Sequence, residues 1–217
     1  MPDNDTKNKI QDIISGTRIT WQADHCTTVR NFLCRSFSAS TTVKKDFDTT
    51  LLIKKEQAEA LREFIDEHQL WVERPPDEEQ LLTIGGEAEI YMNVADQRVL
   101  KLNDAVYYAT WLDFFNSILF HNLFFGATSY ELIGFCLRGQ DLQAVLKQAF
   151  VVSDAAVDLS AVKDFLEFNG FKNTRRNDYY NPEPGLILED IHDENVIMNS
   201  GIMFFIDTVF YIDLEHK

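Results

Sequence analysis

The sequence lacks several features, and each absence excludes a class of protein. It holds only three cysteines, Cys26, Cys34 and Cys136, with no paired metal-ligand spacing. This usage predicts neither a disulfide framework nor a zinc site, and it favours a reducing compartment. No apolar run approaches the length of a membrane span, and the start, MPDNDTKNKIQDII, has no basic region followed by an apolar one. We therefore expect a cytoplasmic protein.

Positive charge is also scarce. The chain has 20 Lys and Arg against 35 Asp and Glu, which gives a formal net charge of -15. Such a field repels phosphate backbones and anionic lipid surfaces. We therefore expect neither nucleic acid nor a membrane as a partner.

What the chain does have is apolar material. Of its 217 residues 45% are hydrophobic, and 17 are Phe, which suffices for one large domain or a domain with a helical appendage. Residues 1–80 carry no repeat and no chemical motif, and their clearest element is an amphipathic helix over 54–71. RPPDEE then interrupts regular structure. We place a boundary there, between a partly helical extension (1–80) of unknown role and a domain (81–217).

The domain is expected to alternate hairpins and helices. Pattern and turn residues predict, in order, two strands, a long buried helix, two strands, a capped helix, a polar loop, and apolar runs around an acidic loop and a turn. The respective ranges are 89–94, 98–102, 104–125, 130–138, 142–152, 158–168, 173–185 and 186–214, with the last turn at 199–201.

Three oxygen-bearing side chains stand out in the closing segment. Asp190 and Asn195 lie five residues apart on the acidic loop, and Asp207 ends the next apolar run, GIMFFID. Magnesium prefers such oxygen ligands together with phosphate oxygens and water. The alternative is that these residues only cap turns, as Asp and Asn often do.

Two features further upstream could serve a phosphate. Lys101 lies inside the apolar strand VLKL, where a lysine either extends its amine to solvent or serves a buried anion. Gly85 and Gly86 precede a strand, and without side chains their amides can approach phosphate oxygens. Two adjacent glycines can equally form a plain turn.

The order of these features resembles the protein-kinase signature set: glycines, a strand Lys, a helix, two strands, a helix, then Asp-x-x-x-x-Asn and Asp. Asp190-Ile191-His192 is similar to the loop of aminoglycoside-phosphotransferase-like kinases. Residues 85–214 resemble the polyvalent-protein kinase domain of bacterial mobile elements and prophages. The matching stretches are VLKLND, DFFNSILFHNLFF, SYELIGF, EFNGF, NDYYN, DIHDENVI and FFID.

The resemblance implies an α+β protein with a minimal protein-kinase-like fold, an antiparallel-sheet N-lobe and a truncated C-lobe. It also implies ATP and Mg²⁺ as cofactors. Lys101 would bind the α and β phosphates, Asp190 would be the catalytic base, and Asn195 and Asp207 would hold magnesium. The Gly85-Gly86 turn would cover the phosphates, and the backbone from Gln148 through Phe150 to Val151 would meet the adenine.

Some residues depart from the kinase pattern. The glycine loop is reduced to Gly-Gly-Glu, and Glu87 would repel phosphate unless it points away. No glutamate is available in the predicted helix to pair with Lys101, and Asp113 is the candidate substitute. His192 could assist the catalytic loop or only shape it. His121 is interpreted as a packed core residue.

Three functions stay open on this sequence. The first is an ATP-dependent phosphotransferase, and the second is an inactive pseudokinase or nucleotide sensor. The third is a structural or interaction module of a mobile-element polyvalent protein, in which the kinase-like core is a scaffold and residues 1–80 are the working part. Because the C-lobe is short, we expect the phosphate acceptor to be small, to be held by residues 1–80 or to be presented by another protein. The acidic residues Glu189, Asp193 and Glu194 favour a cationic acceptor.

Overall fold

The computed structural model describes residues 3–37, 47–74, 76–86, 88–93 and 96–214. The chain divides into two compact units. The sheet unit comprises residues 18–115 and 130–150, and the terminal unit comprises residues 1–17, 116–129 and 151–217. Helix α4 (Trp111–Phe124) is divided between them after residue 115.

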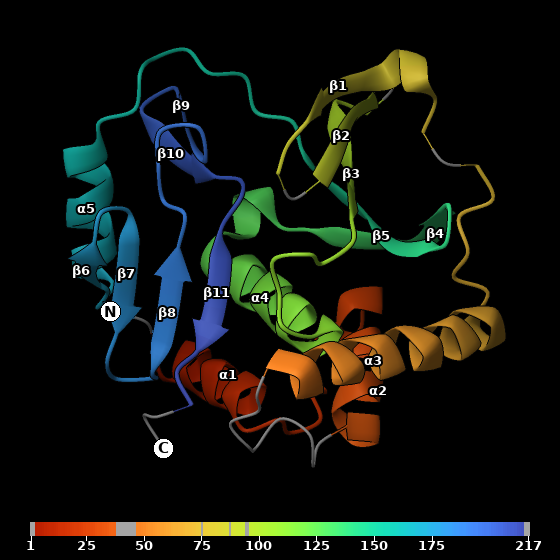
Figure 1. The fold of residues 1–217 in the computed structure, drawn as a ribbon. Helices are drawn as coiled ribbons and strands as arrows, with labels where there is room; N and C mark the ends of the chain where they lie inside the picture. The colour runs from red at the N-terminus through yellow and green to blue at the C-terminus, as the bar shows by residue number, and fades with distance from the viewer. Residues whose placement is uncertain (1–2, 38–46, 75, 87, 94–95, 215–217) are drawn as a thin grey trace. The chain divides into compact units, whose positions relative to one another are not determined.

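A five-stranded antiparallel sheet forms the centre of the sheet unit (Figure 1). Its strand order is β1-β2-β3-β5-β4, so both predicted hairpins are confirmed. Alternation along the strands buries Tyr91, Leu102, Cys136 and Val145 in one cluster. The strands are β1 (Leu81–Ile84), β2 (Ala88–Asn93), β3 (Arg98–Asn103), β4 (Glu131–Arg138) and β5 (Asp141–Ala149). Val94, Ala95 and Glu87 lie outside the described residues.

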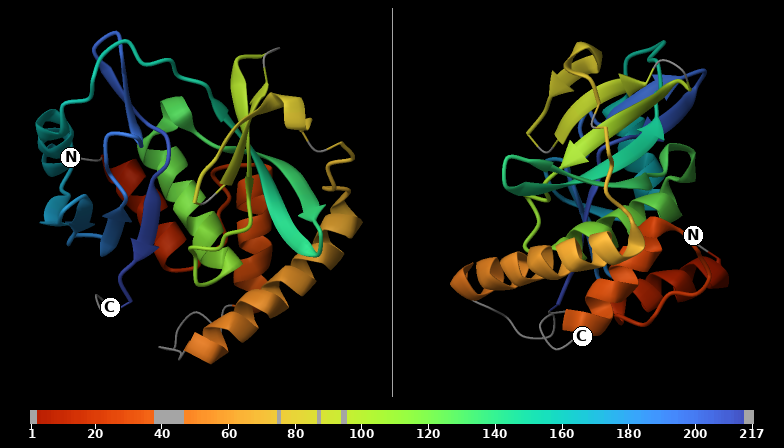
Figure 2. Two further views of the ribbon diagram at one scale, coloured as in Figure 1. Left: turned by 45° about the horizontal axis from the view of Figure 1, so that its top comes forward. Right: turned by 90° about the vertical axis from the view of Figure 1, so that its right-hand side faces the viewer.

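The predicted amphipathic helix is confirmed as α3 (Phe47–His68), a long helix visible in both views of Figure 2. It ends where Gln69 adopts a left-handed φ of 55°. Helix α2 (His25–Phe37) packs against α3 and β4, with the Phe32 and Phe64 rings 4.4 Å apart. Helices α2 and α3, which precede the predicted boundary at residue 80, thus belong to the sheet unit.

The segment after α3 extends the sheet. The Val72 amide donates to the Phe135 carbonyl, and the Phe135 amide donates to the Leu70 carbonyl, each at 2.8 Å. At Gly134 a Cβ atom would lie 2.3 Å from the Leu70 oxygen, so only glycine permits this approach. This contact covers the β4 edge. A one-turn 3₁₀ helix, η2 (Glu78–Gln80), then leads into β1.

The predicted helix over 104–125 is wrong in its first seven residues. The Asn103 and Asp104 side chains accept hydrogen bonds from the amides two residues ahead, at 2.7 and 2.9 Å. Such turns compete with helix formation. Ala105 takes a φ of 58°, and the helix begins only at Trp111, after Thr110 caps it by accepting from the Asp113 amide.

The terminal unit contains helices α1 (Asn4–Ile14) and α5 (Leu159–Phe168), and the Asp158 side chain caps α5 as predicted. Its four-stranded sheet has the order β11-β8-β7-β6, and β9 and β10 form a separate hairpin. Figure 1 shows β8 beside β11. The strands are β6 (Lys172–Arg175), β7 (Asp178–Asn181), β8 (Leu186–Glu189), β9 (Val196–Asn199), β10 (Ile202–Phe205) and β11 (Val209–Ile212).

The loop predicted for 173–185 is wrong, because β6 and β7 lie there. The polar pattern hid a hairpin whose turn is at Arg176, with a φ of 48°, and whose second strand pairs with β8. Tyr179 anchors it by packing into the interior. Pairing with a neighbouring strand overrides weak local β-propensity.

Aromatic rings fill the interior of the terminal unit. Phe124 stacks on Phe210 with ring centres 5.5 Å apart, and Phe125 stacks on Phe205 at 4.2 Å. The helices and antiparallel sheets of the two units confirm the α+β class. Within the described ranges, no helix is long and apolar enough to cross a membrane.

Candidate active site

The loop after β8 begins with a backbone feature at Asp190. This residue adopts a left-handed φ of 67°, which few side chains other than Asn and Asp tolerate. The conformation persists because the Asp190 carbonyl accepts hydrogen bonds from the His192 amide at 3.2 Å and from Asn195 Nδ2 at 2.9 Å.

The side chains of Asp190, His192 and Asn195 contact one another. Asn195 Nδ2 donates one hydrogen to the Asp190 carbonyl and the other to Asp190 Oδ2, at 2.8 Å. His192 Nδ1 accepts from the Glu194 amide at 3.2 Å, so Nε2 carries the proton and faces Asp190 Oδ1 at 3.2 Å. The carboxylate of Asp190 is therefore oriented through both oxygens, while its side chain stays half exposed.

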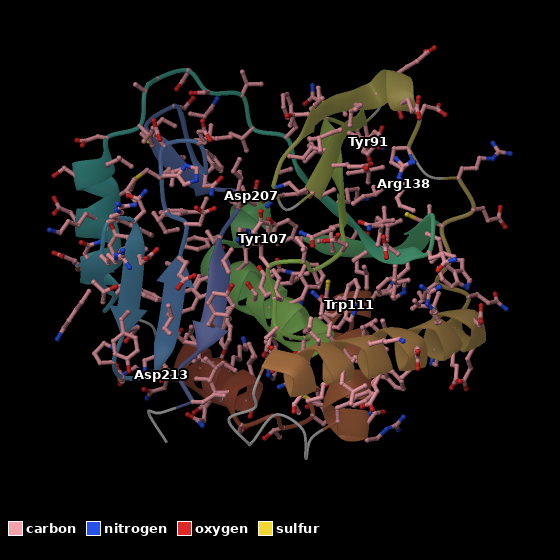
Figure 3. All side chains as sticks on the ribbon, in the orientation of Figure 1. Tyr91, Tyr107, Trp111, Arg138, Asp207 and Asp213 are labelled. Atoms are coloured by element: carbon pink, nitrogen blue, oxygen red, sulfur yellow. The ribbon has the colours of Figure 1, made fainter. Side chains whose placement is uncertain are left out.

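Strand pairing brings Asp207 to the same loop. In the β9–β10 hairpin Phe205 pairs with Val196, and the Ile206 amide donates to the Asn195 carbonyl at 3.0 Å. Asp207 is the next residue, in the stretch that leads to β11, where Figure 3 labels it. On its other side Val209 pairs with Glu189 at the end of β8. The terminal unit thus brings the segments that carry Asp190, Asn195 and Asp207 together.

These residues fit a magnesium ion by their chemistry. Because both hydrogens of Asn195 Nδ2 point to Asp190, its Oδ1 faces elsewhere, and within the described part of the chain it accepts no hydrogen bond. That oxygen and the Asp207 carboxylate are hard ligands of the kind that Mg²⁺ takes alongside phosphate and water. Among the described residues no three His, Cys, Asp or Glu form a metal-binding group, and the predicted pair is an amide and a carboxylate.

Lys101 lies in β3, the middle strand of the five-stranded sheet. It pairs with Ile90 on one side and with Leu146 on the other, and only 4% of the residue is exposed. Its Nζ lies 5.4 Å from the centre of the Tyr130 ring. A cation over an aromatic face is stabilised there. This burial disagrees with a lysine that extends freely to solvent, while phosphate binding stays a prediction.

The two glycines form the turn between β1 and β2. The Gly85 amide donates to the Ala88 carbonyl at 2.9 Å. A Cβ on Gly86 would lie 2.8 Å from the Tyr107 hydroxyl, so this aromatic side chain from the β3–α4 loop rests against the turn. Tyr107, which Figure 3 labels, is 56% exposed. Nothing in the residue pattern predicts this contact.

The predicted adenine-binding segment begins at the end of β5 and continues beyond it. Gln148 pairs with Val99 and is buried, while Phe150 is partly exposed. The Phe150 amide donates to the Gln97 carbonyl at 3.2 Å. The chain passes from the sheet unit to the terminal unit between Phe150 and Val151, which is the predicted hinge position.

Asp113 has a structural role at the start of α4. Its Oδ2 accepts from the Thr110 hydroxyl at 2.7 Å, and burial raises the pKa of its carboxyl group, an effect that Thr110 and Lys54 partly oppose. Among the described residues, Asp113 therefore interacts with Thr110 at the start of its own helix and with Lys54 of α3. Its predicted pairing with Lys101 stays a prediction.

Together these features define a kinase-like domain. A five-stranded antiparallel sheet carries a helix between its third and fourth strands and a buried lysine on the third. The Asp-x-x-x-x-Asn loop, Asp190 to Asn195, precedes the β9–β10 hairpin, and a second Asp, Asp207, follows that hairpin.

The family comparison agrees with this class. The family model for the serine/threonine/tyrosine kinases found in polyvalent proteins matches residues 54–214, and the chain belongs to this family. Its function is accordingly kinase-like. Neither a curated protein nor a solved structure matches the chain. The match begins inside α3, and the domain boundary at residue 80 stays a prediction.

Proposed function

We propose that this protein is an ATP- and Mg²⁺-dependent phosphotransferase. The observation that carries the proposal is the Asp190–Asn195 arrangement. Asn195 Nδ2 fixes the Asp190 carboxylate at 2.8 Å and leaves Oδ1 for a cation, and the β9–β10 pairing brings the segment that carries Asp207 to the Asn195 backbone. Residues that only capped turns would not need a second carboxylate at this position.

The proposed reaction uses four side chains. Lys101 would bind the α and β phosphates, and Asn195 and Asp207 would hold magnesium, which would neutralise charge on the phosphate oxygens. An acceptor hydroxyl attacks the γ-phosphorus and gives its proton to Asp190. A new oxygen–phosphorus bond forms, the bond to the β–γ bridging oxygen breaks, and ADP leaves. The half-exposed carboxylate of Asp190 remains accessible to the acceptor.

Calorimetry of ATP binding in the presence of Mg²⁺ tests the nucleotide half of the proposal. Lys101→Met keeps the apolar stem and removes the charge, so folding should survive while affinity falls at least tenfold. Lys147→Met is the matched control, because Lys147 lies in the same sheet but pairs with Glu131 at 3.0 Å. Equal affinity in wild type and Lys101→Met would contradict the assignment.

Transfer is tested separately with Asp190→Asn, which preserves shape and removes the base. We expect the transfer rate to fall about 10²- to 10⁴-fold while nucleotide affinity is retained. A variant as active as wild type would remove Asp190 from the mechanism.

Two observations favour a second candidate, a pseudokinase that senses nucleotide without transferring phosphate. The Tyr107 side chain rests against Gly86, and the Phe150 amide is already hydrogen-bonded to Gln97. Both groups belong to segments that would contact nucleotide in an active kinase. Binding of ATP with no phosphate transfer to any acceptor, and no ATP hydrolysis, would select this candidate.

The acceptor is proposed to be a small cation, or another protein that presents a basic segment. Glu189, Asp193 and Glu194 surround Asp190 in sequence, and the latter two are exposed. This field attracts positive charge and repels anions. Labelled ATP with small amines, amino alcohols and basic proteins tests the proposal, and we expect folded generic proteins to be poor acceptors. Strong phosphorylation of a folded acidic protein, abolished by Asp190→Asn, would contradict it.

We also propose that the chain is a module of a bacterial mobile-element or prophage polyvalent protein, acting in the cytoplasm. The description of its family, kinases found in polyvalent proteins, supports this setting. The Asp190-Ile191-His192 order further supports a relation to aminoglycoside-phosphotransferase-like kinases. Sequencing of the flanking genes tests the setting, because mobile-element functions should be encoded beside it.

A further inference from the structure

The chain on either side of Asp207 is hydrogen-bonded to one buried group of side chains in the terminal unit. Thr128, at the end of the 3₁₀ helix η3 (Gly126–Thr128), donates its hydroxyl to the Phe205 carbonyl. His121 of α4 lies with its Nδ1 2.7 Å from the Thr208 hydroxyl. Hydrogen bonds thus hold the chain two residues before Asp207 and one residue after it.

His121 and Thr128 are themselves linked. His121 Nε2 lies 2.9 Å from the Thr128 carbonyl, which can only accept, so Nε2 carries the proton. Nδ1 is then the acceptor, and Thr208 donates to it. His121 is fully buried, and Thr128 and Thr208 are nearly so, at 1% and 5% exposure. A buried, satisfied network of this kind favours one arrangement and penalises others.

Two further contacts hold the two residues before Asp207. The Ile206 amide donates to the Asn195 carbonyl at 3.0 Å, and the Phe205 ring stacks on Phe125 at 4.2 Å. The backbone is thereby fixed on both sides of Asp207. These contacts hold the backbone from which the Asp207 side chain extends.

We propose that His121, Thr128 and Thr208 are positioning residues that set the metal-binding geometry of Asp207. The inference rests on the proposed function, because it assigns Asp207 to magnesium. Groups that orient a metal ligand commonly change metal affinity by about 10- to 100-fold when they are removed. His121 acts through the Thr208 hydroxyl and touches neither nucleotide nor metal in this proposal.

The test compares Thr208→Val, which removes the hydroxyl at nearly constant shape, with Thr208→Ser, which retains it. The measurement is the Mg²⁺ concentration that half-saturates ATP binding, followed by calorimetry at fixed nucleotide. We expect this concentration to rise about tenfold in Thr208→Val and to change less than twofold in Thr208→Ser. Thr128→Val removes the bond on the other side of Asp207 and provides a second variant if Thr208→Val does not fold.

Ser117→Ala is the matched control. The Ser117 hydroxyl is equally buried on α4 and accepts from the Phe210 amide at 2.9 Å, three residues beyond Asp207. We expect Ser117→Ala to lower the melting temperature, as Thr208→Val does, and to leave the Mg²⁺ dependence of ATP binding unchanged. Equal effects of Ser117→Ala and Thr208→Val on that dependence would overturn the proposal and indicate a general loss of rigidity.

The remaining outcomes separate this inference from the function on which it rests. If wild type binds ATP with Mg²⁺ and Thr208→Val shows the wild-type Mg²⁺ dependence, only the positioning role is overturned. If wild type binds no ATP at millimolar concentrations, the proposed function is overturned, and the positioning role with it.

Discussion

Gly86 shows how a single missing side chain allows a contact between two loops. An added Cβ would lie 2.8 Å from the Tyr107 hydroxyl but 3.6 Å from the next ring atom, so the hydroxyl alone causes the clash. We expect Gly86→Ala to lower the free energy of unfolding by about 1 kcal/mol in wild type and to be nearly neutral in Tyr107→Phe. A double-mutant cycle by urea denaturation measures this coupling. Equal costs in both backgrounds would contradict the contact.

Glu189 makes the stability of the fold depend on pH. Burial, then Asp178 and Asp190, raise the pKa of its carboxyl above the usual 4.5. The folded protein therefore holds this proton more tightly than the unfolded chain does. The resulting stabilisation is complete below pH 4.5 and is lost as the pH rises through the raised value.

Replacing Glu189 with Gln tests this dependence. We expect the free energy of unfolding of Glu189→Gln, relative to wild type, to increase from pH 4 to pH 7. Denaturation at three pH values measures it, and Glu194→Gln, at an exposed position in the loop that follows β8, is the control. A difference that is constant with pH would show that Glu189 is not the group responsible.

Part of the site follows from residue type and spacing, and part does not. Asp190, Asn195 and Asp207 stand out because the residues that act on phosphate and metal are few in kind, and Lys101 because a charge interrupts an apolar strand. The roles of Tyr107 and Thr208 could not be predicted in this way. Their contacts depend on which loops the fold brings together, and sequence spacing carries no such information.

At the scale of elements, α3 supports the β3–α4 loop through Lys54. Its Nζ donates to the carbonyls of Ala105 and Tyr108, the latter at 3.1 Å, and burial lowers the pKa of the amine while Asp104 and Asp113 oppose that shift. The loop needs this support because Ala105 is held at a positive φ. Helix α3 thus helps to fix the loop that carries Tyr107.

Lys54→Met should therefore destabilise the protein. The Tyr108 carbonyl loses the ammonium donor and the Ala105 carbonyl keeps only the Tyr108 amide, so we expect a loss of about 1 to 3 kcal/mol, measured by chemical denaturation. Lys55→Met on the exposed face of the same helix is the control, with a change of at most about 0.5 kcal/mol. Equal effects of the two substitutions would show that α3 is not coupled to the loop through this amine.

Elements with a strong hydrophobic or capping pattern could be predicted from the sequence. Elements whose formation depends on side-chain turns or on pairing with a strand distant in sequence could not. The hairpins around Lys101 and the cap at Asp158 follow from alternation and capping chemistry. The helix predicted from residue 104 fails because Asn103 and Asp104 form side-chain turns that composition does not reveal. The β6–β7 hairpin was missed because its pairing with β8 compensates for polar strands.

At the scale of the whole molecule, the net negative charge of the protein opposes the approach of the proposed ligand, ATP with magnesium. The net charge of -15 repels an ATP–magnesium complex at long range, whereas the cation proposed to receive it, Lys101, is buried and acts only at short range. Salt screens interactions beyond roughly 10 Å at 0.1 M and affects buried pairs much less. Added salt should therefore weaken the repulsion more than the attraction.

We accordingly expect the association rate of ATP with Mg²⁺ to rise with NaCl, by a few fold between about 20 and 300 mM. Stopped-flow fluorescence with a labelled nucleotide measures the rate, and adenosine, which is uncharged, is the control and should show no salt dependence. A cationic acceptor should show the opposite trend, because the same field attracts it. A nucleotide rate that falls with salt would mean that a local positive field dominates the approach, contrary to what the composition predicts.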